Sequence, residues 1–83
     1  MKVQLRYFAS VREAIGRGAE QRDCAAATLG ALRAELIASG EPYAQALAPG
    51  KAVRMALDQV MAGDEAPLRD GCEIAFFPPV TGG

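Results

Sequence analysis

One long amphipathic helix, with strand-like segments on both sides of it, constrains the fold of this chain most strongly. Leu29, Leu32 and Leu36 recur at helical spacing between a candidate N-cap, Thr28, and a stop at Gly40. The 83 residues are enough for one small domain. Because a sheet buries its apolar face against another layer, and only one substantial helix is predicted, the sequence indicates an α+β domain whose sheet wraps over that helix.

Alternating apolar and polar residues predict strands before and after this helix. The predicted strands cover residues 2–7, 19–24, 53–57, 60–61 and 73–77. A turn at Asp58-Gln59 separates the third strand from the fourth, and a Pro- and Gly-containing turn leads into the last one. Residues 1–77 are therefore expected to form the folded domain, and residues 78–83 an extended tail.

Weaker local signals predict the remaining segments. Ser10 and Glu13 fit a capping box at the start of a short helix that Gly16 would end. In the main helix, Arg33 is expected to face the solvent. Residues 41–51 contain two prolines and are predicted to form a loop with one irregular turn.

Charge and cysteine content argue against several classes of function. A net charge of −1 without a basic stripe predicts neither a nucleic-acid nor a membrane partner. The N-terminus has no apolar signal-peptide region and no run approaches the length of a membrane span, so we expect a cytoplasmic protein. Cys24 and Cys72 lie far apart and histidine is absent, so no metal site is expected, and both thiols are interpreted as buried apolar residues.

The predicted domain carries no pattern typical of an active site. Without histidine, an ordinary Ser-His-Asp or Cys-His site is excluded, and no phosphate-binding motif occurs. Lys51 and Arg54 would give a small basic spot, for which ordinary surface charge is the favoured interpretation. The chain is therefore expected to bind no cofactor of its own.

The C-terminal segment is the strongest functional signal. Pro78 and Pro79 lack backbone donors and fix φ, so the chain leaves the sheet there as a stiff stalk. Gly82 and Gly83 carry no side chains and can pass through a channel too narrow for any other residue. The terminal carboxylate could then enter the active site of another protein. A frayed, inert terminus is the alternative interpretation.

A carboxylate is ionised at neutral pH and resists nucleophiles, so it must be activated before it transfers anything. Activation as a mixed anhydride with AMP is the most economical route. Because no ATP-binding motif is present, a separate adenylating enzyme would use the ATP. A sulfur donor could then convert the acyl adenylate into a thiocarboxylate.

The ending FFPPVTGG, the preceding PLRDG and EIA segments, and the N-terminal YFASVREAIG resemble the small subunits of molybdopterin synthase, the MoaD family. The resemblance implies a β-grasp, ubiquitin-like fold. It implies that Gly83 is adenylated by a ubiquitin-activating-type adenylyltransferase, becomes a thiocarboxylate and donates sulfur to cyclic pyranopterin monophosphate. It also implies a heterotetramer with the large synthase subunit. The docking residues of that assembly precede the slim Gly82; they are Phe77, Pro78, Pro79, Val80 and Thr81.

Three alternatives remain open at this point. The chain could carry sulfur for thiamine or tRNA thiolation, could be a ubiquitin-like modifier that conjugates Gly83 to lysines, or could be an interaction module with an inert tail. One structural expectation bears on docking. Strand alternation places Phe77 on the opposite sheet face from Ile74 and Phe76, so we expect it to be exposed in the free chain and available for a partner to cover.

Overall fold

The computed structural model describes residues 1–79; the expectations for Val80, Thr81, Gly82 and Gly83 lie outside the described residues. The elements follow the order β1 (Lys2–Tyr7), α1 (Ala9–Ile15), β2 (Ala19–Asp23), α2 (Leu29–Ala38), α3 (Tyr43–Ala46), β3 (Arg54–Leu57), β4 (Val60–Met61) and β5 (Glu73–Phe77). Every predicted strand is present, and α3 is the single irregular turn expected in the loop after α2.

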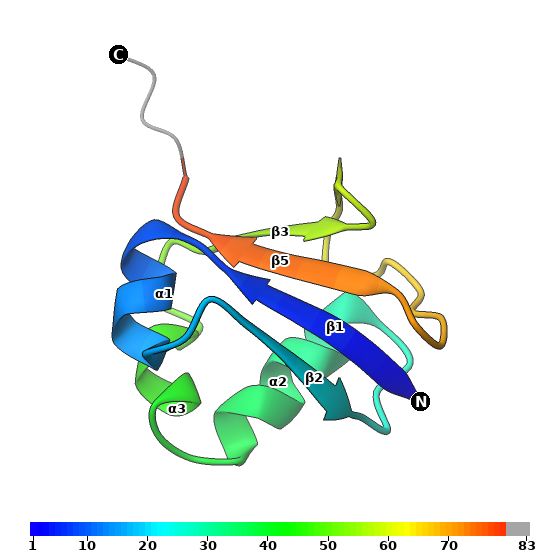
Figure 1. Cartoon of the computed structure of the whole chain (residues 1–83), viewed down its shortest axis with the longest axis horizontal. Coiled ribbons are helices and arrows are strands. Elements are labelled where there is room, and N and C mark those ends of the chain that lie inside the picture. Colours follow the sequence, from blue (N-terminus) through cyan, green and yellow to red (C-terminus); the bar gives the residue numbers. More distant parts are fainter. Residues whose placement is uncertain (80–83) are drawn as a thin grey trace.

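The strands form one sheet in the order β2-β1-β5-β3-β4. β1 and β5 are parallel, and the other neighbouring pairs are antiparallel. The helices lie against one face of this mixed sheet, and the other face is open (Figure 1). The predicted α+β class and its β-grasp arrangement, a mixed sheet over one main helix, are confirmed.

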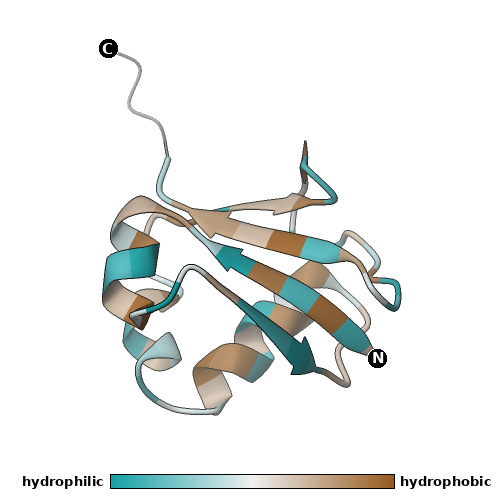
Figure 2. Cartoon of the chain, viewed as in Figure 1, coloured by the Kyte–Doolittle hydropathy of each residue, from teal (hydrophilic) through white to brown (hydrophobic). Residues whose placement is uncertain are grey.

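The core lies between α2 and the inner face of the sheet. Leu29, Leu32 and Leu36 of α2 are fully buried, as the helical spacing predicted. Alternation places every second residue of β1 on the same inner face, and Figure 2 shows the resulting apolar and polar bands along that strand. Cys24 and Cys72 are free and buried, as expected for thiols that act as small apolar residues.

The ends of the two longer helices test the predicted caps. Thr28 caps α2, since its hydroxyl accepts a hydrogen bond from the Ala31 amide at 3.2 Å. The capping box predicted at Ser10 is wrong: Phe8 is the N-cap of α1 and makes no side-chain cap bond. Ser10 lies inside the first turn, whose amides are satisfied by the Phe8 carbonyl instead. Gly16 ends α1 with φ of 91°, as predicted.

A second expectation, an outward-facing Arg33, is also wrong. The Arg33 guanidinium reaches back to the loop after α3, where its Nε donates to the Leu47 carbonyl at 2.8 Å and its Nη2 to the Ala48 carbonyl at 2.9 Å. These carbonyls lie 14 and 15 residues along the chain. Because the loop packs beside α2, the guanidinium satisfies backbone groups that would otherwise lack partners.

The tight turn between β3 and β4 is the one predicted at Asp58-Gln59. Both residues adopt left-handed conformations, with φ of 49° and 69°, as a two-residue hairpin turn requires. The Asp58 carboxylate accepts hydrogen bonds from the Glu73 amide at 3.0 Å and from Arg69 at 2.9 Å. These bonds hold the pKa of Asp58 below its usual range. The hairpin is therefore fixed to the start of β5.

Candidate docking surface at the root of the tail

β5 ends where the C-terminal tail begins, and its alternation decides which side chains a partner can reach. Ile74 and Phe76 point into the core and are 0% exposed, whereas Phe77 is half-buried on the opposite face. The predicted sheet face of Phe77 is confirmed, but its side chain is half-buried and not exposed as predicted. Residues 78–79, red in Figure 1, leave the sheet on the side away from the helices.

Contacts on both sides fix the C-terminal end of β5. On one side the Phe8 amide donates to the Phe76 carbonyl at 3.1 Å, and the Tyr7 ring stacks on the Phe76 ring with centroids 6.0 Å apart. On the other side Arg54 of β3 pairs with Phe77. Because β5 is the central strand of the sheet, the tail starts from the most constrained backbone of the domain.

Small and aromatic side chains gather on the open sheet face around this point. The register aligns Ala75 of β5 with Ala56 of β3 and Met61 of β4, and Phe8 follows the Tyr7–Phe76 pair on the other side. Phe8 is 45% exposed and Met61 57% exposed. We call this surface the tail-root patch; it consists of Phe8, Ala56, Met61, Ala75 and Phe77.

Polar side chains border this patch on the open face. Lys2 and Gln4 of β1 lie at its far end, and Arg6 forms an ion pair with Glu73 at 3.5 Å. The apolar patch therefore lies near the root of the tail, with Arg6 opposite Ala75 and Arg54 opposite Phe77 at its margin. An apolar area rimmed by polar groups is typical of a protein–protein contact surface.

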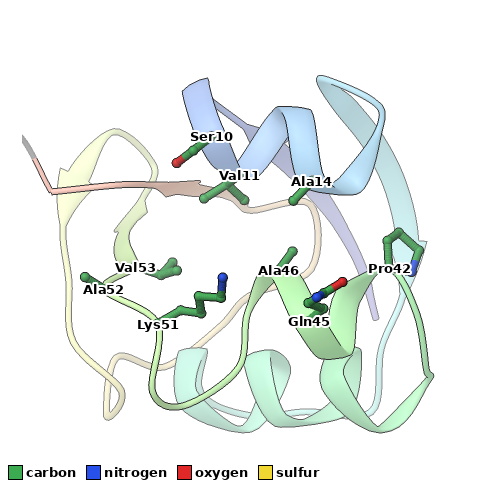
Figure 3. A pocket seen from close by; sticks show the side chains of 9 residues that line it. All are labelled: Ser10, Val11, Ala14, Pro42, Gln45, Ala46, Lys51, Ala52 and Val53. Atoms are coloured by element: carbon green, nitrogen blue, oxygen red, sulfur yellow. The ribbon is translucent and has the colours of Figure 1, made fainter.

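A hollow of about 210 Å³ lies between α1, α3 and the loop before β3. Figure 3 shows the Lys51 amine directed into it, with the Ser10 hydroxyl on the facing helix. Apolar side chains such as Val11 and Val53 form most of its remaining wall. Because no carboxylate or thiol lines it among the described residues, this hollow offers no carboxylate acid–base pair and no thiol nucleophile.

Sequence analysis missed one polar cluster, centred on Glu20. One oxygen of this carboxylate accepts hydrogen bonds from the hydroxyls of both Tyr7, at 2.8 Å, and Tyr43, at 2.6 Å. Burial, followed by these bonds to the carboxylate, raises the pKa of each tyrosine. Neither phenol is therefore a base near neutral pH. The cluster joins β1, β2 and α3, three elements far apart in sequence.

Of the predicted site residues, Phe77, Pro78 and Pro79 lie together at the root of the tail and are half-buried. Val80 to Gly83 lie outside the described residues. Within residues 1–79, no group of three or more histidine, cysteine or acidic side chains is arranged to hold a metal ion. None of the helices in that range has the length and apolar character needed to cross a membrane.

Comparison with known proteins gives a consistent result across nearly the whole chain. Residues 5–83 match the model of the ThiS family. The chain is 41% identical to the molybdopterin synthase sulfur carrier subunit of Escherichia coli K12, over 98% of this chain and 99% of that protein. It is 44% identical to the protein of the same description from Haemophilus influenzae, over 93% of this chain and 94% of that one.

Solved structures share the fold. SAMP1 from Haloferax volcanii, at 22% identity, superposes with a TM-score of 0.77 over the full length of both chains. At this identity the likeness concerns the fold alone. A chain from the complex of subunits 1 and 2 of the molybdopterin-converting factor of Helicobacter pylori is 30% identical, with a TM-score of 0.68 and full coverage of both chains.

Proposed function

The chain belongs to the ThiS family, and from this premise we propose that it is the sulfur carrier subunit of a molybdopterin synthase. The observation that carries the proposal is the pair of relatives of that description, 41% and 44% identical over nearly their whole lengths. The open sheet face supports it, because its apolar part surrounds the point where the Gly-Gly tail begins.

The proposed chemistry takes place at the Gly83 carboxylate. An oxygen of this carboxylate attacks the α-phosphorus of ATP on an adenylating partner, so that an acyl adenylate forms and pyrophosphate leaves. A donor that delivers a sulfide equivalent then forms a bond to the carbonyl carbon, and AMP leaves. The product is a terminal thiocarboxylate, in which one carboxylate oxygen has been replaced by sulfur.

In the next step, the tail would enter the large synthase subunit. From Pro78, six residues extend by about 20 Å at about 3.3 Å each, which is enough to reach a buried site. Gly82 provides the slim neck behind the reacting group, and Phe77 to Thr81 form the docking stalk. Sulfur would pass to cyclic pyranopterin monophosphate, and two such transfers would complete the dithiolene of molybdopterin.

We propose that the tail-root patch docks on that large subunit. The related Helicobacter pylori chain is described in a complex of subunits 1 and 2, which supports a two-subunit assembly. Phe8 and Met61 are exposed in the free chain and would gain the most from being covered. A cytoplasmic location fits this scheme, because activation consumes ATP and both cysteines are free thiols.

Intact-protein mass spectrometry tests the central step. After incubation with ATP, the adenylating enzyme and a sulfur donor, the mass should rise by about 16 Da, the difference between sulfur and oxygen. Deleting Gly83 should abolish the shift and all product formation. Replacing Cys24 and Cys72 together by alanine should leave the shift unchanged. A shift that needs the cysteines but not Gly83 would overturn the proposal in favour of a persulfide carrier, and high-mass lysine conjugates would indicate a modifier.

A further inference from the structure

A second depression, of about 420 Å³, lies beside the tail-root patch, along the edge of the sheet at β3 and β4. Met61 belongs to both surfaces, so the two are continuous. Its lining combines three charged side chains with an apolar floor; the lining residues are Arg33, Val53, Arg54, Met55, Met61, Ala62, Gly63 and Asp64.

Of the three charged side chains, Arg33 is already hydrogen-bonded within the domain, and Asp64 lies against the start of α2. Arg33 donates its Nε and Nη2 hydrogens to the carbonyls of Leu47 and Ala48. Asp64 packs directly on Gly30 in the first turn of α2, where a Cβ on the glycine would lie 2.8 Å from the aspartate Cβ. The positive end of that helix favours a carboxylate at this position.

Arg54 is the third charged side chain that lines the depression. It is exposed, and among residues 1–79 it lies within 4 Å of no carboxylate, Asp64 included. It is also the register partner of Phe77, the residue at which the tail begins. A partner that covers Phe77 and Met61 must therefore come close to the Arg54 guanidinium.

A guanidinium that loses water in an interface without gaining a partner is strongly unfavourable, whereas pairing with a carboxylate offsets the loss. We propose, on the basis of the proposed function, that this depression receives an aspartate or glutamate side chain of the large subunit, and that Arg54 binds its carboxylate. The carboxylate can accept two parallel hydrogen bonds from the guanidinium. Val53 and Met61 supply apolar walls for the methylene groups behind it.

This pairing makes Arg54 a specificity determinant, because a large subunit without an acidic residue at that place would leave the cation unpaired. The test compares Arg54→Glu with Lys2→Glu. Both variants change the net charge equally and both positions are exposed, but Lys2 begins β1 at the polar end of the open face. Calorimetric titration with the large subunit should show at least tenfold weaker binding for Arg54→Glu and a change below about twofold for Lys2→Glu. Equal affinities for the two variants would overturn the inference.

A covalent readout identifies the partner residue. In an Arg54→Lys variant, a carbodiimide can join the new amine to a carboxylate in contact with it, so that an amide forms while the reagent takes up the water and becomes a urea. Peptide mass spectrometry should find residue 54 linked to one acidic residue of the large subunit. If the variant binds but yields no linked peptide from position 54, the inference fails. If the unaltered chain does not bind the large subunit at all, the proposed function itself fails, which separates the two outcomes.

Discussion

Replacing Phe77 by alanine should weaken the complex with the large subunit while the domain stays folded. Phe77 stands at the root of the tail on the open face, half-buried and flanked by Arg54 across the strand pair. The adjacent Phe76 has no exposed surface and fills the core. Truncating Phe77 should therefore lower the affinity for the large subunit, whereas truncating Phe76 should lower the stability of the fold.

The size of the effect follows from the area that remains for a partner. An aromatic side chain presents about 200 Å². In a half-buried residue no more than about a third of that, roughly 70 Å², stays accessible. At about 25 cal/mol per Å², covering it contributes about 1.8 kcal/mol to binding, which corresponds to a loss of about 20-fold in affinity on truncation. Phe76→Ala should instead cost about 3–5 kcal/mol of folding stability.

Titration calorimetry measures the affinity, and urea unfolding measures the stability of each variant. Ile37→Ala is the matched control, since Ile37 is also a half-buried apolar residue but lies on α2, on the helical side of the sheet. It should lose stability and retain full affinity. If Phe77→Ala binds as tightly as the unaltered chain, or if Ile37→Ala weakens binding equally, the assignment of the open face as the docking surface is refuted.

Three further predictions follow from the tail, a helix cap and the tyrosine cluster. Gly82→Val should block molybdopterin formation without altering the melting temperature, whereas Gly50→Val, at an exposed position where a Cβ meets nothing, should retain full activity in the same assay. Thr28→Ala should lower the free energy of unfolding by about 1 kcal/mol in urea titrations, and Thr28→Ser should restore it. The folded-state pKa values of Tyr7 and Tyr43 are raised, so the stability that these residues contribute is complete below their ordinary pKa. This contribution declines above about pH 10, because tyrosines of the unfolded chain ionise first. Tyr7→Phe should reduce that decline between about pH 8 and pH 11, and an unchanged decline would contradict the hydrogen-bonded role given to Tyr7.

Features set by local spacing could be predicted from the sequence. Residues close to each other in the sequence determine the helix around Leu32, its cap at Thr28 and the last strand. The error at Ser10 was also local: the pattern was displaced from the real cap by two residues, because the Phe8 carbonyl closes the first turn of α1. A capping pattern is defined by side chains, so it does not reveal a backbone carbonyl that satisfies the first amides of the helix.

Features that need the register of several strands could not be predicted. The tail-root patch brings together side chains from β1, β3, β4 and β5, and no spacing in the sequence reveals that Met61 aligns with Ala75 through Ala56. The same holds for Glu20, which binds tyrosines 13 and 23 residues away. The helical pattern places Arg33 towards the solvent because the loop that it binds is distant in sequence. Long-range pairing, not local propensity, forms these sites.

The parallel pairing of β1 with β5 has a consequence for synthesis and turnover. β5 is synthesised late, yet it is the strand that links the antiparallel β1–β2 pair to the β3–β4 hairpin. A chain that stops before residue 73 leaves two antiparallel strand pairs without a shared neighbour, and an isolated two-stranded pair is at best marginally stable. We therefore expect prematurely ended chains to unfold and, if the chain docks on a large subunit as proposed, to bind it poorly. The strand that completes the fold is the one that precedes the C-terminal tail, so a folded chain has already been extended almost to its Gly-Gly end.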